Sequence, residues 1–391
     1  MPKPLADRVA DMGPRSLIRE MTDLLAEAKE TYQGRLINLG QGTPPFSLPE
    51  YVREKIAHAI LHEPGINRYT LQPGLPKLRE AVAEKIGART EDVYISAGSM
   101  AGLGQVVASA VNPGDEVILT NPHYEPMRIV TLMWGGVPVY VPLIEEEGWK
   151  LDTERLGDSV SERTKLIVMN TPANPTGNIF SEDELREVAR IAAENNSYVL
   201  CDEAYRFLTY DGERHVSMMS MNIPEMDELL VTCLTASKEE AMTGFRVGYV
   251  HTKNRELFDA MIKFHDAHSI CAPSLSQFAA YFALTGQRDH VEEFRTELDR
   301  RRELLREKAE KIDGFEYAEP KGAYYAFVRY NRSVSSLEYS KRLLAEKGVA
   351  TIPGETFGSL GQGHIRISFA AAPEDIEEGM ERIKDFQERL A

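Results

Sequence analysis

The chain has 391 residues, of which 42% are hydrophobic and 27% are charged, and its formal net charge at pH 7 is −16. The composition is ordinary for a soluble globular protein, and the length predicts two domains because one hydrophobic core rarely serves so many residues. The acidic charge disfavours nucleic acids and anionic membranes as partners, and no stretch is apolar over the length of a membrane span.

The N-terminal segment predicts a helix and no secretion signal. Residues 16–30 carry apolar residues at helical spacing, and Ser16 stands where a helix cap is expected. Residues 1–14 contain no apolar signal-peptide core. The three cysteines are widely spaced, which fits a reducing cytoplasm and excludes a disulfide framework or a cysteine-rich zinc site. They are Cys201, Cys233 and Cys271.

Residues 92–250 alternate between strand and helix patterns. The helical segment 181–196 begins with a capping box formed by Ser181 and Glu184. Such alternation predicts a mostly parallel sheet covered by helices on both faces, because right-handed crossovers place the helices there. The expected strands are residues 115–120, 137–143, 165–170, 197–202, 229–235 and 246–250.

The pattern changes after about Pro273 to that of an α+β module. A long charged helical segment, residues 287–312, precedes a strand within 322–330, a helix near 336–347 and a strand at 364–369. We interpret the charge run as a solvated helix face without a binding role.

Two histidine pairs have the spacing of shared metal ligands. His58 and His62 are four residues apart, and His265 and His268 are three apart. Neither pair has an acidic or histidine partner at a metal-motif spacing, so we interpret all four as surface histidines and expect no metal.

Chemistry-bearing residues follow three of the expected strands. Asn174 lies in the loop after 165–170, Asp202 and Tyr205 follow 197–202, and Lys238 follows 229–235. Ligands of open α/β sheets bind beyond the carboxyl ends of the strands, so these side chains are expected to converge. Asn174 has an ordinary alternative as a turn residue, and Asp202 as a helix cap. Lys238 precedes two glutamates, so a surface ion-pair patch is its alternative.

Several motifs in this order resemble the pyridoxal-phosphate aminotransferases of the aspartate aminotransferase type. The resemblance covers nearly the whole chain and departs from the family at Pro45, where aspartate is usual. The matching segments are LGQGTPPF at 39–46, YTLQPGLPKLREAVA at 69–83, NPTG at 174–177, DEAY at 202–205, SK at 237–238, GFRVGY at 244–249 and RIS at 366–368.

This resemblance implies an α/β fold with two domains. The large cofactor-binding domain would comprise residues 49–285, with a mostly parallel, seven-stranded-type sheet between helices. The smaller α+β domain would comprise residues 286–391, together with the N-terminal segment 1–48.

The resemblance also implies roles at the cofactor ring. Lys238 would hold pyridoxal 5'-phosphate covalently and then act as the base that moves the substrate's α-proton, which suits a desolvated lysine with a lowered pKa. Asp202 would keep the ring nitrogen protonated, Tyr205 and Asn174 would bind the ring hydroxyl oxygen, and Tyr124 would stack on the ring.

The phosphate of the cofactor would lie where a strand gives way to a helix, because helix N-terminal amides favour an anion. By resemblance, one tyrosine reaches the phosphate of a neighbouring subunit, which makes the active unit a homodimer. The expected phosphate residues are Gly98, Ser99, Met100, Thr235, Ser237, Arg246 and, from the other subunit, Tyr69.

Arg366 would bind the α-carboxylate of the substrate, with Gly42 and Asn174 beside it. The alternative for Arg366 is a structural ion pair. Met100 stands where a lysine contacts the distal carboxylate in some aspartate-specific relatives, so we expect a neutral, apolar or aromatic substrate. The alternative is that Met100 only packs its helix while another arginine meets a distal carboxylate.

The function that the resemblance implies is ping-pong amino transfer between an L-amino acid and a 2-oxo acid. The alternatives are an aspartate or glutamate aminotransferase, and a C–S lyase or aminocyclopropane-carboxylate-synthase-like eliminase on the same site. A non-catalytic regulator fused to a DNA-binding module is disfavoured, because only about forty residues precede LGQG and they show no helix-turn-helix pattern.

Overall fold

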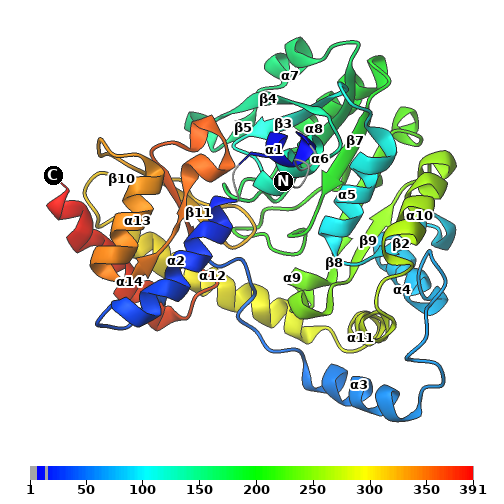
Figure 1. Ribbon diagram of the computed structural model, residues 1–391, viewed down its shortest axis with the longest axis horizontal. Coiled ribbons are helices and arrows are strands. Elements are labelled where there is room, and N and C mark those ends of the chain that lie inside the picture. Colours follow the sequence, from blue (N-terminus) through cyan, green and yellow to red (C-terminus); the bar gives the residue numbers. More distant parts are fainter. Residues whose placement is uncertain (1–6, 14–15, 391) are drawn as a thin grey trace, which may run out of the picture.

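The computed structural model describes residues 7–13 and 16–390. The segment examined for a secretion signal, residues 1–14, therefore lies partly outside the described residues. A large sheet with helices on both faces occupies one side of the molecule, and a smaller sheet with its own helices occupies the other (Figure 1). Within the described ranges, no helix combines the length and the apolar character needed to cross a membrane.

The large sheet confirms the expected mostly parallel architecture. Five neighbouring strands, β8, β7, β6, β3 and β4, run parallel, whereas β9 is antiparallel to both β8 and β2. An eighth strand, β5, extends the expected seven by a short antiparallel pairing with β4. In spatial order the strands are β2 (Val93–Ser96), β9 (Gly248–His251), β8 (Leu230–Thr235), β7 (Tyr198–Asp202), β6 (Thr164–Asn170), β3 (Glu116–Asn121), β4 (Val137–Ile144) and β5 (Lys150–Leu151).

Both faces of this sheet are buried, which explains why its strands are apolar at nearly every position. In β6, Leu166 and Val168 pack on one face while Ile167 and Met169 pack on the other. One face is covered by α5 (Ser99–Ala110), α6 (Glu125–Met133) and α10 (Arg255–Ser269). The opposite face carries α8 (Glu182–Glu194), α3 (Glu50–His62), α4 (Pro76–Ile86) and α11 (Ser274–Thr285).

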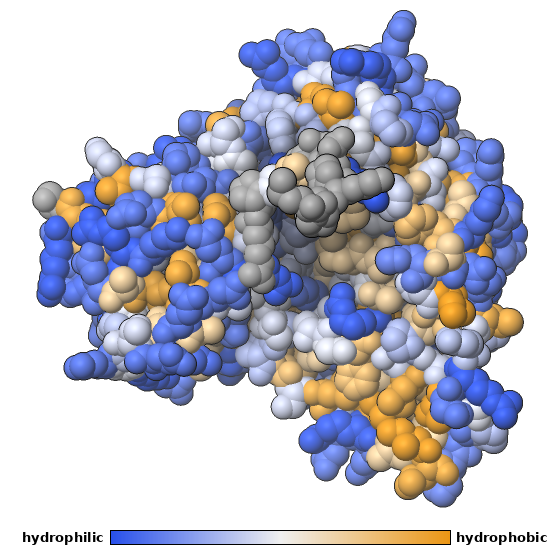
Figure 2. All heavy atoms as spheres, viewed as in Figure 1, coloured by the Kyte–Doolittle hydropathy of each residue, from blue (hydrophilic) through white to orange (hydrophobic). Residues whose placement is uncertain are grey.

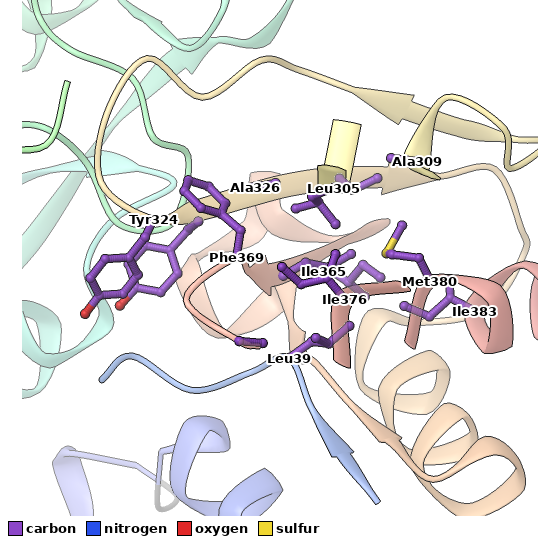
Figure 3. Packing of buried hydrophobic residues seen from close by; sticks show 14 of the residues in the cluster. Leu39, Leu305, Ala309, Tyr324, Ala326, Ile365, Phe369, Ile376, Met380 and Ile383 are labelled. Atoms are coloured by element: carbon purple, nitrogen blue, oxygen red, sulfur yellow. The ribbon is translucent and has the colours of Figure 1, made fainter. Parts of the chain in front are cut away.

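The smaller sheet is antiparallel, and the core beside it draws on both ends of the chain. Figure 3 shows Leu39, from the N-terminal part, packed in one core with Ile365 and Ile376 from the C-terminal part. The sheet order is β10 (Phe315–Tyr317), β11 (Tyr325–Tyr330), β14 (His364–Ser368) and β13 (Ile352–Pro353), with β1 (Ile37–Asn38) paired to β12 (Val349–Ala350) beside it. Its helices are α2 (Leu17–Thr31), α12 (Asp289–Ala309), α13 (Ser336–Lys347) and α14 (Pro373–Arg389).

The two helix caps expected from sequence have different outcomes. The capping box of α8 is confirmed, since Ser181 Oγ accepts from the Glu184 amide and the Glu184 carboxylate accepts from the Ser181 amide. Ser16 is the N-cap residue of α2, as expected, but its side chain makes no capping hydrogen bond, and its hydroxyl donates instead to Glu125 Oε2 at 2.5 Å. The hydroxyl therefore links the start of α2 to the start of α6.

The interpretation of all four paired histidines as surface residues is wrong for one of them. His58, His62 and His268 are exposed, but His265 is fully buried and its Nδ1 lies 2.7 Å from Gln105 Nε2. His265 shares the buried face of α10 with residues four and seven positions earlier, a periodicity that the metal-spacing argument overlooked.

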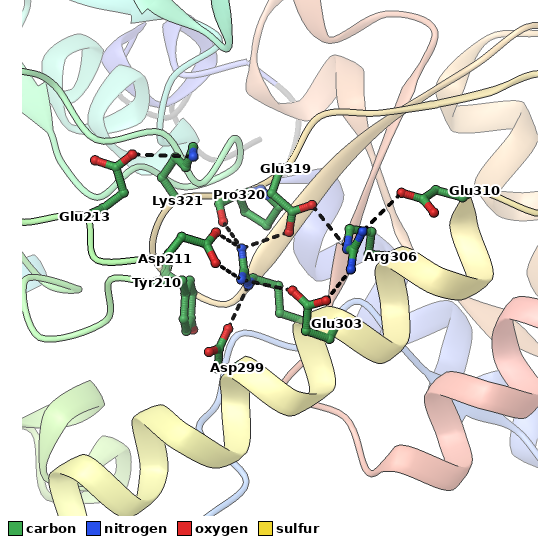
Figure 4. A network of polar contacts seen from close by, with 12 residues as sticks. Tyr210, Asp211, Glu213, Asp299, Glu303, Arg306, Glu310, Glu319, Pro320 and Lys321 are labelled. Atoms are coloured by element: carbon green, nitrogen blue, oxygen red, sulfur yellow. Dashed lines mark hydrogen bonds and ion pairs between the residues drawn. The ribbon is translucent and has the colours of Figure 1, made fainter.

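Arg302, a buried arginine of α12, ties this helix to the loop that follows β7. The polar network to which it belongs includes Asp211 and Glu319, which are labelled in Figure 4. Arg302 is 1% exposed and binds Asp211 at 2.7 Å and Glu319 at 2.8 Å. Tyr210, next to Asp211, donates its hydroxyl hydrogen to the Ala323 carbonyl oxygen at 2.6 Å. This network fixes the segment after β7 against the segment that leads into β11, and both contribute to the cavity described next.

Candidate active site

A cavity of about 530 Å³ lies beyond the carboxyl ends of β6, β7 and β8. Most of the side chains that sequence analysis assigned to the ring and the substrate line it. They are Gly42, Ser99, Met100, Tyr124, Asn174, Asp202, Tyr205, Lys238 and Arg366. The other lining residues are Ser16, Ile18, Arg19, Thr43, Glu125, Pro126, Ile129, Val130, Met133, Asn170, Ala204 and Tyr325.

Lys238 reaches the cavity from the short helix α9 (Ala236–Glu239), which directly follows β8. Its Nζ donates to the Gly42 carbonyl oxygen at 2.6 Å and lies 5.6 Å from the ring centres of Tyr205 and Tyr324. Burial lowers the pKa of Lys238 from its ordinary value, because desolvation disfavours the ammonium form. At neutral pH the lowered pKa leaves a larger fraction of this lysine as the free amine, which is the form that reacts as a nucleophile or accepts a proton.

The two glutamates after Lys238 point elsewhere. Glu239 pairs with Lys85 at 2.7 Å and with Arg288 at 2.5 Å, and Glu240 also pairs with Arg288 at 2.5 Å. The two glutamates therefore do form ion pairs, although Glu240 is buried, whereas Lys238 lines the cavity and is in no ion pair among the described residues.

Asp202 ends β7 and is 3% exposed. Its Oδ1 accepts one long hydrogen bond, 3.3 Å from the Ala204 amide. Burial raises the pKa of Asp202 to about 7, since few donors compensate for the lost water. A cationic N–H donor in the cavity would reverse this shift, so Asp202 is suited to binding such a donor.

Two tyrosines and two asparagines connect the floor of the cavity. Tyr205 Oη lies 2.9 Å from Tyr325 Oη, and burial raises the pKa of Tyr205 well above its ordinary value. The Asn170 side chain accepts from the Asn174 amide at 2.8 Å and donates to the Asp202 carbonyl oxygen at 3.2 Å. These bonds hold the loop after β6 in register with the end of β7.

Arg366 on β14 is a buried guanidinium without a counter-ion. It is 2% exposed, and its Nη atoms donate to Asn174 Oδ1 at 2.8 Å and to the Gly40 carbonyl oxygen at 2.7 Å. Its Nε has no partner, and no carboxylate of the described residues lies within 4.0 Å. The structural ion-pair alternative is therefore absent from the described part of the chain. A buried, unpaired arginine is the binding group expected for an anionic ligand.

The expected phosphate residues gather at the start of α5, beside the ring and substrate residues. Gly98 has φ +85°, and a Cβ atom there would lie 2.4 Å from Arg246 Nη2. The Ser237 amide donates to Thr235 Oγ1 at 3.0 Å. Gly98, Thr235, Ser237 and Arg246 do not line the cavity itself. Tyr69 is 75% exposed and lies away from it in this chain.

Sequence analysis missed two tyrosines at the start of β11. Tyr324 donates to the Gly42 carbonyl oxygen at 2.7 Å, the oxygen that Lys238 also binds, and the Tyr325 ring lies 4.2 Å from the Arg366 guanidinium. The tyrosine pair within GAYYAFVRY gave no distinct signal, because tyrosine is also common in purely structural strands. Arg19 and Ile18, from the start of α2, were also missed.

The cavity thus contains the Lys238 amine, the Asp202 carboxylate with few donors, and the Arg366 guanidinium without an anion. Gly98 and Arg246 lie in close contact at the N-terminus of α5 next to it. The sequence model of the family described as aminotransferase class I and II matches residues 34–383. The chain belongs to this family.

Individual members of the class I and II aminotransferases resemble the chain over its whole length. An aspartate aminotransferase of Pyrococcus abyssi is 34% identical over 97% of both chains. The aromatic-amino-acid aminotransferase 2 of Thermococcus litoralis is 33% identical over 97% of both chains. A solved single mutant of the Thermus thermophilus aspartate aminotransferase, 32% identical, superposes with a TM-score of 0.91 over 98% of this chain and 100% of its own.

The protein is accordingly a pyridoxal-phosphate-dependent aminotransferase of fold type I. The residues present fit this cofactor. Asp202 lacks a strong donor, the Lys238 amine lies in the cavity wall, and the Gly98–Arg246 contact leaves no room for a side chain beside the helix start.

Proposed function

We propose that Lys238 binds the cofactor and then moves the α-proton of the substrate. Pyridoxal phosphate, when bound, supplies an electron-withdrawing ring that acidifies the α-C–H bond of an attached amino acid. The support for Lys238 is its burial, its lowered pKa and the Gly42 carbonyl oxygen that orients its Nζ. Released from covalent attachment, the amine would carry the proton to and from the α-carbon.

We assign the ring contacts to the residues that surround Lys238. Asp202 would accept a hydrogen bond from the protonated ring nitrogen. This donor would replace the water that burial removes from the carboxylate. Tyr205 and Asn174 would bind the ring hydroxyl oxygen, and Tyr124 would stack on the ring. The catalytic residues in this proposal are Lys238, Asp202 and Tyr205.

The phosphate would bind at the start of α5. Gly98, Ser99 and Met100 begin this helix, whose amides favour an anion. Arg246 supplies the charge, and hydroxyl groups complete the binding site. The hydroxyl donors proposed are those of Ser99, Ser237, Thr235 and, from a second subunit, Tyr69.

The α-carboxylate of the substrate would bind Arg366, beside Asn174 and Gly42. The unpaired, buried Arg366 guanidinium is the single observation that best supports an amino-acid substrate, because such a group needs an anion. The substrate carboxylate could displace the Asn174 amide oxygen from Arg366, or it could bind the free Nε. Either arrangement would give the two-point contact that carboxylates favour.

The substrate side chain is proposed to be neutral, and apolar or aromatic. Met100 and Ile18 line the cavity with three residues of α6, Ile129, Val130 and Met133. An apolar wall disfavours a buried second carboxylate. The measurement is kcat/KM for phenylalanine, leucine, methionine, alanine and aspartate with one common oxo acid. A tenfold preference for aspartate, about 1.4 kcal/mol, would contradict this assignment.

Borohydride reduction followed by peptide mass mapping tests the covalent role. The reduced cofactor is expected on Lys238, and Lys238→Ala should bind the cofactor without turning over. Labelling of another lysine would overturn the assignment. Mixing enzyme and amino acid with and without a 2-oxo acid separates transfer from the eliminase alternative, because only transfer needs the second substrate for continued turnover.

We further propose a homodimer, a cytoplasmic location and a division of the chain into two domains. The domain boundaries would lie between residues 48 and 49 and between residues 285 and 286. Figure 2 shows an apolar surface over the region of α3, where Ile60 is 54% and Leu61 75% exposed. Exposed apolar areas of this kind mark protein interfaces. Three free cysteines fit a reducing compartment. Light scattering coupled to size exclusion measures the oligomeric state, and a monomer would contradict the role given to Tyr69.

A further inference from the structure

A second cavity lies beside the one described above and has no part in the proposed chemistry. Its volume is about 320 Å³, which is near the lower end of the range for small-molecule sites. Glu125 lines both cavities, so they are neighbours. On the side of the large sheet, the wall comes from the end of β3, from α6 and from β4. On the side of the smaller sheet, it comes from residues 355–359, which precede β14.

Two buried side chains in this wall lack hydrogen-bond partners. His123, between β3 and α6, is 5% exposed, and neither of its ring nitrogens has a partner among the described residues. Burial lowers the pKa of His123 to about 4, so at pH 7 the neutral ring has one donor and one acceptor. The hydroxyl group of Thr356, which is also buried, has no partner there either. Buried polar groups are seldom left unpaired, so both side chains indicate a polar occupant of the cavity.

The charged groups of the wall leave one positive charge uncompensated. Arg128 has no carboxylate within 4.0 Å among residues 7–13 and 16–390, and its one acceptor in these ranges is the Met12 carbonyl oxygen at 3.4 Å. The Glu355 carboxylate accepts from the Leu337 amide at 3.0 Å, at the start of α13, where helix amides compensate a negative charge. Burial raises the pKa of Glu125, which favours its neutral form. The wall is therefore complementary to a ligand with a single negative charge.

We propose that this second cavity binds a small monocarboxylic acid as its anion. The Arg128 guanidinium holds the carboxylate, because its planar fork binds two oxygen atoms at once. The Thr356 hydroxyl and the N–H group of His123 donate to the same oxygens. The apolar part of the ligand contacts Leu17 and the ring of Tyr140, whose centre lies 5.2 Å from that of His123. A dianion fits less well, because two carboxyl groups already line the wall.

A ligand in this cavity would connect the two sides of the molecule that already meet there. The His123 amide donates to the Phe357 carbonyl oxygen at 2.9 Å, and the Leu360 amide donates to Asn121 Oδ1 at 3.3 Å. A carboxylate between α6 and residues 355–359 adds further contacts across the same junction. Binding should therefore slow the exchange of backbone amide hydrogens in residues 354–361.

The test is a titration of the cofactor-loaded enzyme with 4-fluorobenzoate, followed by fluorine NMR. Arg366→Met removes the arginine of the first cavity, so carboxylate binding in this variant reports on the second cavity. Adding Arg128→Met should raise Kd about tenfold or more, because hydrogen bonds to a charged group are lost. Arg155→Met is the matched control and should change Kd less than about twofold, which is within the range of a neutral surface substitution. Arg155 is an exposed arginine of α7 (Thr153–Ser159) that lines neither cavity.

Hydrogen exchange in the same Arg366→Met enzyme locates the ligand independently. Peptides that cover residues 354–361 should exchange more slowly with 4-fluorobenzoate, and adding Arg128→Met should remove this protection. An Arg366→Met enzyme that does not bind the probe would show that the cavity holds water only, and protection that survives Arg128→Met would place the ligand elsewhere. Either result overturns the proposal. Displacement of the probe by an equal concentration of chloride also overturns it, because the site would then select any anion and not a carboxylate.

Discussion

Replacing Asp202 by asparagine should change activity and stability in opposite directions. Asparagine keeps the shape of the side chain but cannot carry the charge that stabilises a protonated ring nitrogen. Two unit charges at a hydrogen-bonding distance of about 3 Å attract by about 5 kcal/mol at an effective dielectric constant of about 20. A neutral hydrogen bond to the asparagine recovers about 1 kcal/mol. The loss of about 4 kcal/mol corresponds to a roughly thousandfold lower kcat/KM.

Asp202→Asn should increase the stability of the cofactor-free protein at neutral and higher pH. Burial raises the pKa of Asp202 to about 7, against about 3.9 in an unfolded chain. Above pH 7 the folded protein must therefore hold an ionised carboxylate that the unfolded chain solvates more favourably. The folded state binds the proton more tightly, so the contribution of Asp202 to stability is largest below pH 4 and is lost as the pH rises to 7. Asp202→Asn should match wild type near pH 4 and exceed it at pH 8 by an amount on the order of 4 kcal/mol.

Two assays test the predicted loss of activity and gain of stability in Asp202→Asn. The first is the single-turnover rate of the loaded enzyme with one amino acid, and the second is urea unfolding of the cofactor-free protein from pH 4 to 8. Glu203→Gln is the matched control, because Glu203 is an equally buried carboxylate whose Oε1 accepts from Ser217 at 2.5 Å and which does not line the cavity. An Asp202→Asn enzyme within tenfold of wild-type activity, or a stability difference that does not grow with pH, would refute the reasoning.

Three further substitutions test other parts of the site. Arg366→Lys keeps the charge but loses the planar guanidinium that binds a carboxylate at two points. It should raise KM for amino acids about thirtyfold in steady-state assays, which corresponds to about 2 kcal/mol. An unchanged KM would show that another group binds the α-carboxylate. Gly98→Ala places a Cβ atom 2.4 Å from Arg246 Nη2 and should weaken cofactor binding at least tenfold in fluorescence titrations. Gly87→Ala is its control, with a similar φ of +69° and open space, so equal loss in both variants would point to the backbone alone. Arg302→Met breaks the buried ion pairs to Asp211 and Glu319 and should lower the free energy of unfolding by about 3 kcal/mol in urea; a change below about 1 kcal/mol would mean that these pairs contribute little.

Local sequence alone predicted the main elements of the large sheet and of α8. Short continuous apolar runs and the helical runs between them specify strands and helices, because a strand covered on both faces and a helix covered on one face bury different patterns of residues. The capping box of Ser181 and Glu184 acts over three residues and was therefore visible in the sequence. Asn174, Asp202 and Lys238 could be expected at one edge because the strands before them are parallel neighbours, and all three line the cavity.

The tertiary structure decided what depends on segments far apart in the chain. The hydrogen-bonded residues Tyr205 and Tyr325 are 120 positions apart in the sequence, and Ser16 and Glu125 are 109 apart. No local pattern therefore predicts either contact. The same holds for Arg19, whose place in the cavity wall follows from how α2 packs and not from its own neighbours in the sequence. Sequence periodicity records which face of an element is buried, but not which distant element buries it, because hydrophobic contact is non-directional and polar partners are chosen by the packing geometry.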